Sequence, residues 1–101
     1  GVVCLSPAYD LLNTTLVLGN ASEESALPLR GKKRKLTRGD WVDYLCRERL
    51  GLTAAILDPI LHTLDTSQDV WGRKIENSYI SAPAKTGYLE ILNDRRSRLF
   101  G

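Results

Sequence analysis

The sequence predicts a mainly α-helical protein, in which a short strand and turn precede an irregular bundle of about four helices. Apolar residues recur at spacings of three and four through most of residues 37–101, which is the periodicity of amphipathic helices. Only residues 2–5 form a β-branched apolar run typical of a strand. The hydrophobic fraction of 43% in 101 residues is that of a globular protein, so we expect a single domain. Within it, residues 1–36 supply strand, turn and basic loop, and residues 37–101 supply the bundle.

The first element is the predicted strand over residues 2–5, which we expect to be buried. Pro7 cannot donate to a strand ladder, so the strand should end there. Asp10 then falls in a turn before a short helical segment that begins at Leu11. Two roles for this carboxylate stay open: it caps the following turn, or it holds a hard cation such as Mg²⁺.

A polar loop follows, and after it comes the densest positive charge in the chain. This basic run consists of Arg30, Lys32, Lys33, Arg34 and Lys35. One interpretation is a solvated loop whose charges face water, and the other is a patch that binds the phosphates of a nucleic acid or nucleotide. The run contains no aromatic residue, so it does not indicate the base stacking used to bind single strands.

The first helix of the bundle is predicted between Thr37 and Gly51. Thr37 and Asp40 are suited to its first turn, and Gly51 is suited to its end. Trp41 and Tyr44 fall on one face at helical spacing, so we expect them to pack in the core.

Three more helices are predicted after residue 51. One begins at Thr53 and contains Pro59, which either kinks it or lies in its first turn. A capping cluster at residues 66–69 opens the next helix, which runs through residue 79. Ser81 opens the last, whose buried face includes Tyr88 and Leu92. In this helix Gly87 either weakens the helix or admits another element closely.

Composition limits the remaining functional classes. A net charge of +2 is too small to indicate nucleic-acid binding by itself, and no apolar run approaches the ~20 residues of a membrane span. The N-terminus shows no signal-peptide pattern, so we expect a cytoplasmic protein without membrane partners. Cys4 and Cys46 are expected to be buried, reduced thiols. His62 is the only histidine, so no Ser/His/Asp triad is available, and we expect a structural role for it.

The run Leu5-Ser6-Pro7-Ala8-Tyr9-Asp10-Leu11-Leu12 resembles the segment that carries the metal-binding aspartate of HipA-like serine/threonine kinases. These are the toxin kinases of bacterial type II toxin–antitoxin modules and their relatives. Residues 26–32, which end in Gly-Lys, and the helical stretch 36–50 resemble later segments of the family in the expected order. The resemblance implies that the chain is the C-terminal helical region of such a kinase. It also implies that Asp10 holds Mg²⁺ against the phosphates of ATP.

The resemblance also implies parts that these 101 residues do not supply. A HipA-like kinase needs a nucleotide-binding lysine, a phosphate-covering loop and a catalytic loop, all of which lie upstream of the aspartate. We therefore expect the isolated chain to be inactive and to need an N-terminal kinase core as its partner. The family's association with a DNA-binding antitoxin implies a second candidate partner. Two alternatives stay open: a non-enzymatic helical module that binds DNA or an antitoxin, and a remnant without activity.

Overall fold

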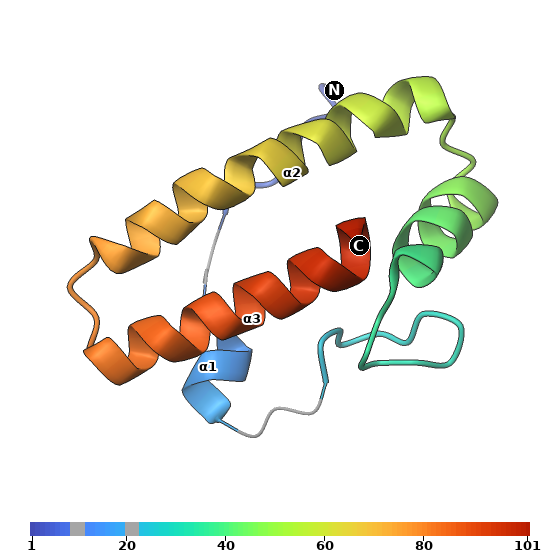
Figure 1. Cartoon of the computed structure of the whole chain (residues 1–101). Coiled ribbons are helices and arrows are strands. Elements are labelled where there is room, and N and C mark those ends of the chain that lie inside the picture. The colour runs from blue at the N-terminus through green and yellow to red at the C-terminus, as the bar shows by residue number, and fades with distance from the viewer. Residues whose placement is uncertain (9–11, 20–22) are drawn as a thin grey trace.

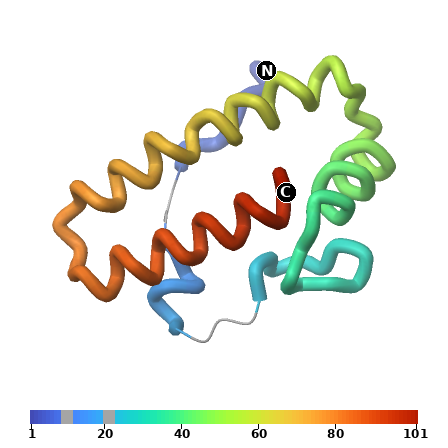
Figure 2. The backbone as a smooth tube through the Cα atoms, viewed as in Figure 1, coloured from blue at the N-terminus to red at the C-terminus, as the bar shows by residue number. Residues whose placement is uncertain are grey.

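Two long antiparallel helices, α2 (Ala54–Glu76) and α3 (Ala82–Phe100), dominate the computed structural model (Figure 1). The structure describes residues 1–8, 12–19 and 23–101. The short α1 (Thr14–Leu18) packs against α3, and a π-helix, η1 (Gly39–Arg49), precedes α2. The backbone trace shows α3 returning along α2 after the turn at residues 77–81 (Figure 2). The prediction of a mainly α fold is confirmed.

The predicted buried strand at residues 2–5 is wrong. Residues 1–8 have no regular secondary structure, and the side chains of Val2, Val3 and Leu5 are almost fully exposed, Val3 at 100%. The described residues contain no strand beyond the isolated bridge between Leu29 and Lys32, so nothing there completes a ladder for this β-branched run. Cys4 is exposed for the same reason, against the expectation that it is buried.

The first helix of the bundle forms near the predicted limits, but as a π-helix. The backbone N–H of Leu50 donates to the carbonyl of Leu45 at 3.0 Å, which is the i to i−5 pattern. This wider spacing changes which side chains face inward. Asp40 and Val42 are the buried residues, whereas Trp41, predicted to lie in the core, is 37% exposed.

The two helices predicted on either side of residue 66 form one continuous helix, α2. Thr66 and Ser67 do not cap a new helix, because their hydroxyls donate to carbonyl oxygens of the preceding turn, Ser67 Oγ to Thr63 O at 2.7 Å. Pro59 lies inside α2, near its N-terminal end. The polar cluster at 66–69 is thus accommodated within the helix rather than ending it.

The start of α3 agrees with the sequence. Ser81 is its N-cap, and the Ser81 hydroxyl accepts a hydrogen bond from the backbone N–H of Ala84 at 3.3 Å. A Cβ atom added to Gly87 would lie 3.1 Å from Leu16 Cδ1. Gly87 therefore admits α1 against α3, which is one of the two roles the sequence left open.

The best-buried apolar side chains come from the loop before η1, from η1 itself and from the start of α2. They are Leu29, Leu36, Val42 and Leu57. No large side chain in the described part of the chain is completely buried, and the radius of gyration of 15.3 Å exceeds the ~13 Å typical of a compact 100-residue domain. The fold therefore leaves much of its apolar surface open to solvent.

Candidate functional site

Asp10, the residue predicted to bind Mg²⁺, lies outside the described residues, together with Tyr9 and Leu11. The helix that follows it is capped by another residue. Asn13 is the N-cap of α1, and Asn13 Oδ1 accepts a hydrogen bond from the backbone N–H of Leu16 at 3.1 Å. The start of α1 therefore does not need the capping role that the sequence offered to Asp10.

The described residues do not form a metal site by themselves. Nowhere among them do three or more His, Cys, Asp or Glu side chains gather in a way that could hold an ion. Magnesium commonly uses only one or two carboxylates and takes its other ligands from phosphates and water. A single carboxylate such as Asp10 fits Mg²⁺ only where a nucleotide and other protein groups complete the coordination.

The basic run begins with a tight two-residue turn. Leu29 and Lys32 exchange two backbone hydrogen bonds, 2.8 and 2.9 Å long, across Arg30 and Gly31. Arg30 and Gly31 both have positive φ, 51° and 75°, as the turn of a two-residue hairpin requires. The turn points the following lysine, Lys32, toward the start of η1.

Lys32 binds the buried carboxylate of Asp40, with its Nζ 2.7 Å from Asp40 Oδ2. The same oxygen accepts the backbone N–H of Thr37 at 2.9 Å, so Asp40 reaches back to the start of its own helix as the acid of a capping box does. Hydrogen bonds from Lys32 and from the Thr37 backbone, partly opposed by burial, lower the pKa of Asp40 from 3.8 to about 2. Lys32 therefore has a structural role.

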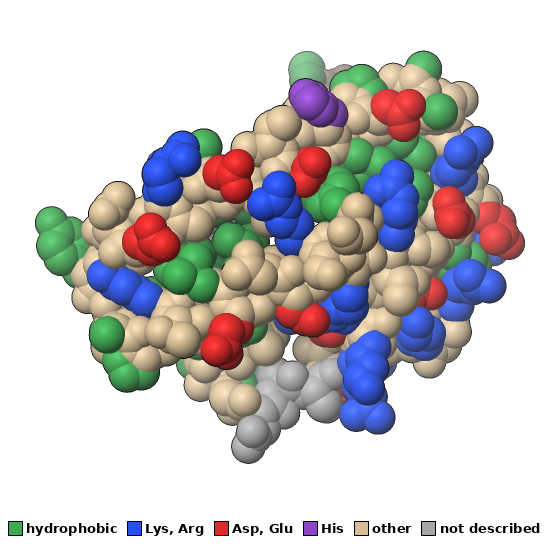
Figure 3. Space-filling view, in the orientation of Figure 1, with side chains coloured by type: hydrophobic (Ala, Val, Ile, Leu, Met, Phe, Trp, Pro, Cys, Tyr) green, Lys and Arg blue, Asp and Glu red, His purple; other side chains and the backbone are tan. Residues whose placement is uncertain are grey.

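Two other cations of the run also have partners. The Arg30 guanidinium lies 5.7 Å from the centre of the Tyr44 ring, within cation–π range. Lys33 Nζ lies 3.7 Å from Glu23 Oε1, in an exposed pair. Arg34 and Lys35 are exposed. Lys and Arg side chains gather over the loop and η1 (Figure 3), but three of the five residues of the predicted patch have partners within the protein.

An ion pair that the sequence did not suggest joins the loop to α3. Arg98 Nη1 lies 2.7 Å from Glu24 Oε1, and both side chains are largely buried. The Glu24 carboxylate also accepts the backbone N–H groups of Lys35 and Leu36. Burial raises the pKa of Glu24, but the hydrogen bonds from Arg98, Leu36 and Lys35 outweigh it and hold the pKa below its ordinary value.

The arginines near the end of α3 also make specific contacts. Arg95 donates to Thr15 Oγ1 at 2.9 Å, and Arg96 pairs with Asp65 and Asp69 of α2 at 3.2 and 3.3 Å. These contacts fasten α3 to both α1 and α2.

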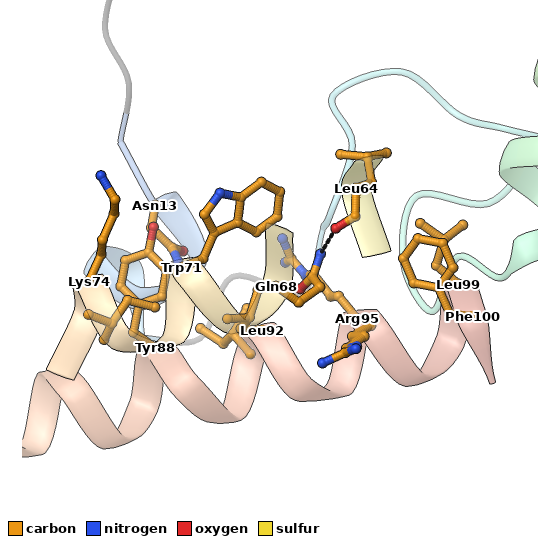
Figure 4. Close-up of a pocket in the computed structure, with 13 residues that line it drawn as sticks. Asn13, Leu64, Gln68, Trp71, Lys74, Tyr88, Leu92, Arg95, Leu99 and Phe100 are labelled. Atoms are coloured by element: carbon orange, nitrogen blue, oxygen red, sulfur yellow. Dashed lines mark hydrogen bonds between the residues drawn. The ribbon is translucent and has the colours of Figure 1, made fainter. Parts of the chain in front are cut away.

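A groove of about 540 Å³ runs between α2 and α3 and is edged by Asn13 (Figure 4). Its walls are mostly apolar and aromatic, and they include Leu64, Trp71, Ile75, Tyr88, Ile91, Leu92, Leu99 and Phe100. Its polar residues are Asn13, Gln68, Lys74, Arg95 and Arg96. The volume and the mixture of apolar walls with a few polar groups are those of a binding site.

The sequence indicated that residues of this groove lie on an apolar helix face, but it did not indicate that the face lines an open groove. Tyr88 and Leu92 were predicted to lie on the buried face of the last helix, and each is only half-buried, as is Leu99. Periodicity shows that a face is apolar, but it does not show whether another element covers that face.

A scan of the sequence against models of protein families and a search among curated proteins both found no match. None of the helices in the described ranges is long and apolar enough to cross a membrane.

Proposed function

We propose that this chain is the C-terminal helical part of a HipA-like serine/threonine kinase and that it contributes the Mg²⁺-binding aspartate, Asp10. The observation that carries the proposal is the run Leu5–Leu12, whose residues resemble the metal-binding segment of that family. The mainly α fold that follows the run is compatible with it. The proposal also agrees with the capping of α1 by Asn13, because that helix start takes its cap from a residue other than Asp10.

In this proposal the chain completes an active site and does not form one alone. Phosphoryl transfer requires several groups that act together, among them a nucleotide lysine and a catalytic loop. The N-terminal kinase core would supply those groups and bind ATP, and Asp10 would add a full negative charge close to the magnesium. The metal, when bound, neutralises charge on the transferring phosphoryl group.

Replacement of Asp10 by Asn in the complete kinase tests the proposal. Asparagine keeps the size of the side chain and one carbonyl oxygen but removes the charge, so phosphate transfer should fall by orders of magnitude while the melting temperature holds. The matched control is Asp58→Asn, which removes one exposed carboxylate from α2 and should leave transfer unchanged. Full activity of the Asp10→Asn kinase would refute the assignment.

A further inference from the structure

The groove is lined by two stripes with the same spacing. On α2 the stripe is Leu64, Gln68, Trp71 and Ile75, and on α3 it is Tyr88, Leu92, Arg95 and Leu99. In both stripes the steps are four, three and four residues, which is the spacing of the seam positions in helices that pack side by side. On the open side of the groove, each helix thus presents a seam of the kind that packs against another helix.

We propose that this groove binds an amphipathic helix with an apolar face and acidic flanks, supplied by the kinase core. The source of the helix rests on the proposed function, whereas its chemistry follows from the groove. From Leu64 to Ile75 the stripe spans roughly 16 Å at 1.5 Å per residue, which is the length of about three helical turns. A helix of that length places apolar side chains at positions i, i+4 and i+7 along such a groove.

The acidic flanks follow from the charge at the rim. Lys74, Arg95 and Arg96 line the groove, and no Asp or Glu of the described ranges does so. Arg96 is already paired with Asp65 and Asp69, so Lys74 and Arg95 supply the remaining positive charge. Opposite charge on the incoming helix would favour its association and fix its orientation.

Gln68 provides a further sign that a partner is missing. Its side chain is buried, with 8% exposed, and its Nε2 donates to the carbonyl of Leu64 at 3.1 Å. Its Oε1 has no hydrogen-bond donor among the described residues. Because a buried acceptor without a donor is costly, a polar donor on the docked helix next to Gln68 would stabilise the complex.

Trp71 fluorescence of the full chain, with Trp41→Phe to remove the second reporter, tests the docking. The probe is a three-turn synthetic peptide with Leu on one face and Glu on both flanks, and its twin carries Lys in place of Glu. We expect the acidic peptide to bind 1:1 with a saturable blue shift, at least about tenfold more tightly than its twin at low salt. Equal affinities, or no saturation, would overturn the proposal.

A charge exchange makes the test specific to the groove. Lys74→Glu with Arg95→Glu should reverse the preference toward the basic twin, and the matched control, Arg34→Glu with Lys35→Glu, should not. Because Arg95 also contacts Thr15, the milder pair Lys74→Gln with Arg95→Gln should abolish the preference while circular dichroism confirms the helix content. Saturable binding of decanoate without peptide binding would show a small-molecule site and overturn the proposal.

This measurement uses neither nucleotide nor kinase activity. An active Asp10→Asn kinase alongside charge-selective peptide binding would reject the proposed function and retain the helix-binding groove. Loss of phosphate transfer in the Asp10→Asn kinase, together with no peptide binding, would retain the proposed function and reject the helix-binding groove.

Discussion

Two carboxylates, the buried Asp40 and the half-buried Glu24, hold the loop before η1 against the helices. Asp40 pairs with Lys32 and accepts a backbone N–H at the start of η1. Glu24 pairs with Arg98 and accepts a backbone N–H of the basic loop. Each carboxylate satisfies several donors at once, which is how buried charge is tolerated in proteins. Much of the charge near the basic run therefore serves the fold.

The lowered pKa of Asp40 predicts a loss of stability in acid. Its pKa is about 2 in the folded protein and about 3.8 when the chain is unfolded, so between these values the unfolded state binds more protons. The Asp40 contribution is complete above about pH 4 and disappears as the pH falls through about 2. In urea denaturation across this range, Asp40→Asn should be less stable at pH 7 by about 1 kcal/mol and should show a smaller loss in acid. An unchanged acid slope would contradict this role.

Two residues of the basic run, Lys32 and Arg34, should respond differently to neutralisation. Lys32→Gln removes the ammonium group that faces the buried Asp40 and should lower the free energy of unfolding by about 1 kcal/mol. Arg34→Gln removes an exposed charge and should change it by less than about 0.5 kcal/mol. Urea denaturation of the two variants at pH 7 measures both values, and equal effects would show that Lys32 is merely solvated.

At the scale of elements, the close approach of α1 and α3 depends on Gly87. A glycine inside a helix is usually destabilising relative to alanine by about 1 kcal/mol. Here the added methyl group would lie 3.1 Å from Leu16 Cδ1, so Leu16 must shift to admit it. Gly87→Ala would therefore raise the helix propensity of α3 but would make α1 and α3 pack less closely.

A double-mutant cycle separates these two effects. Gly87→Ala should stabilise the Leu16→Ala protein by about 1 kcal/mol and the natural protein by less. Thermal and urea denaturation of the four proteins give the coupling. Additive effects would mean that α1 does not constrain position 87.

The continuity of α2 shows a limit of local sequence patterns. Thr66, Ser67 and Gln68 are typical of a helix start, yet each bonds to a carbonyl of the preceding turn. The same side chains that cap a new helix can remain inside an existing one. The continuous helix α2 packs against α3, and the ion pairs from Arg96 to Asp65 and Asp69 join the two helices at this point.

At the scale of the whole molecule, large apolar side chains remain exposed on several elements. They include Val2, Val3, Leu5, Ile56, Ile60, Val70 and Trp71. Trp71 lines the open groove, where apolar side chains of two helices gather as they do at sites that bind a partner. This agrees with the proposal that the chain works as part of a larger kinase.

The isolated chain should neither bind ATP measurably nor transfer phosphate. A single metal-binding aspartate does not position a nucleotide, because the lysine, covering loop and catalytic loop that do so are not found in these 101 residues. Incubation with labelled ATP and Mg²⁺ followed by electrophoresis measures transfer. Robust autophosphorylation would contradict the proposal that the chain needs a kinase core for phosphate transfer.

The sequence by itself determined the mainly α fold and the start of α3 at Ser81, and it offered the close approach at Gly87 as one of two roles for that residue. These features depend on local periodicity, capping and side-chain size, which a short stretch of sequence contains. It also supplied the proposed role of Asp10, through the resemblance of residues 5–12 to the metal-binding segment of HipA-like kinases.

Only the tertiary structure decided which residues meet. The pairs from Lys32 to Asp40 and from Glu24 to Arg98 join residues 8 and 74 positions apart, and no local pattern encodes such partners. The widened turns of η1 buried Asp40 in place of Trp41, and the run at residues 2–5 found no strand among the described residues. The groove was decided in the same way, because an apolar stripe becomes a core or a binding surface according to what packs against it.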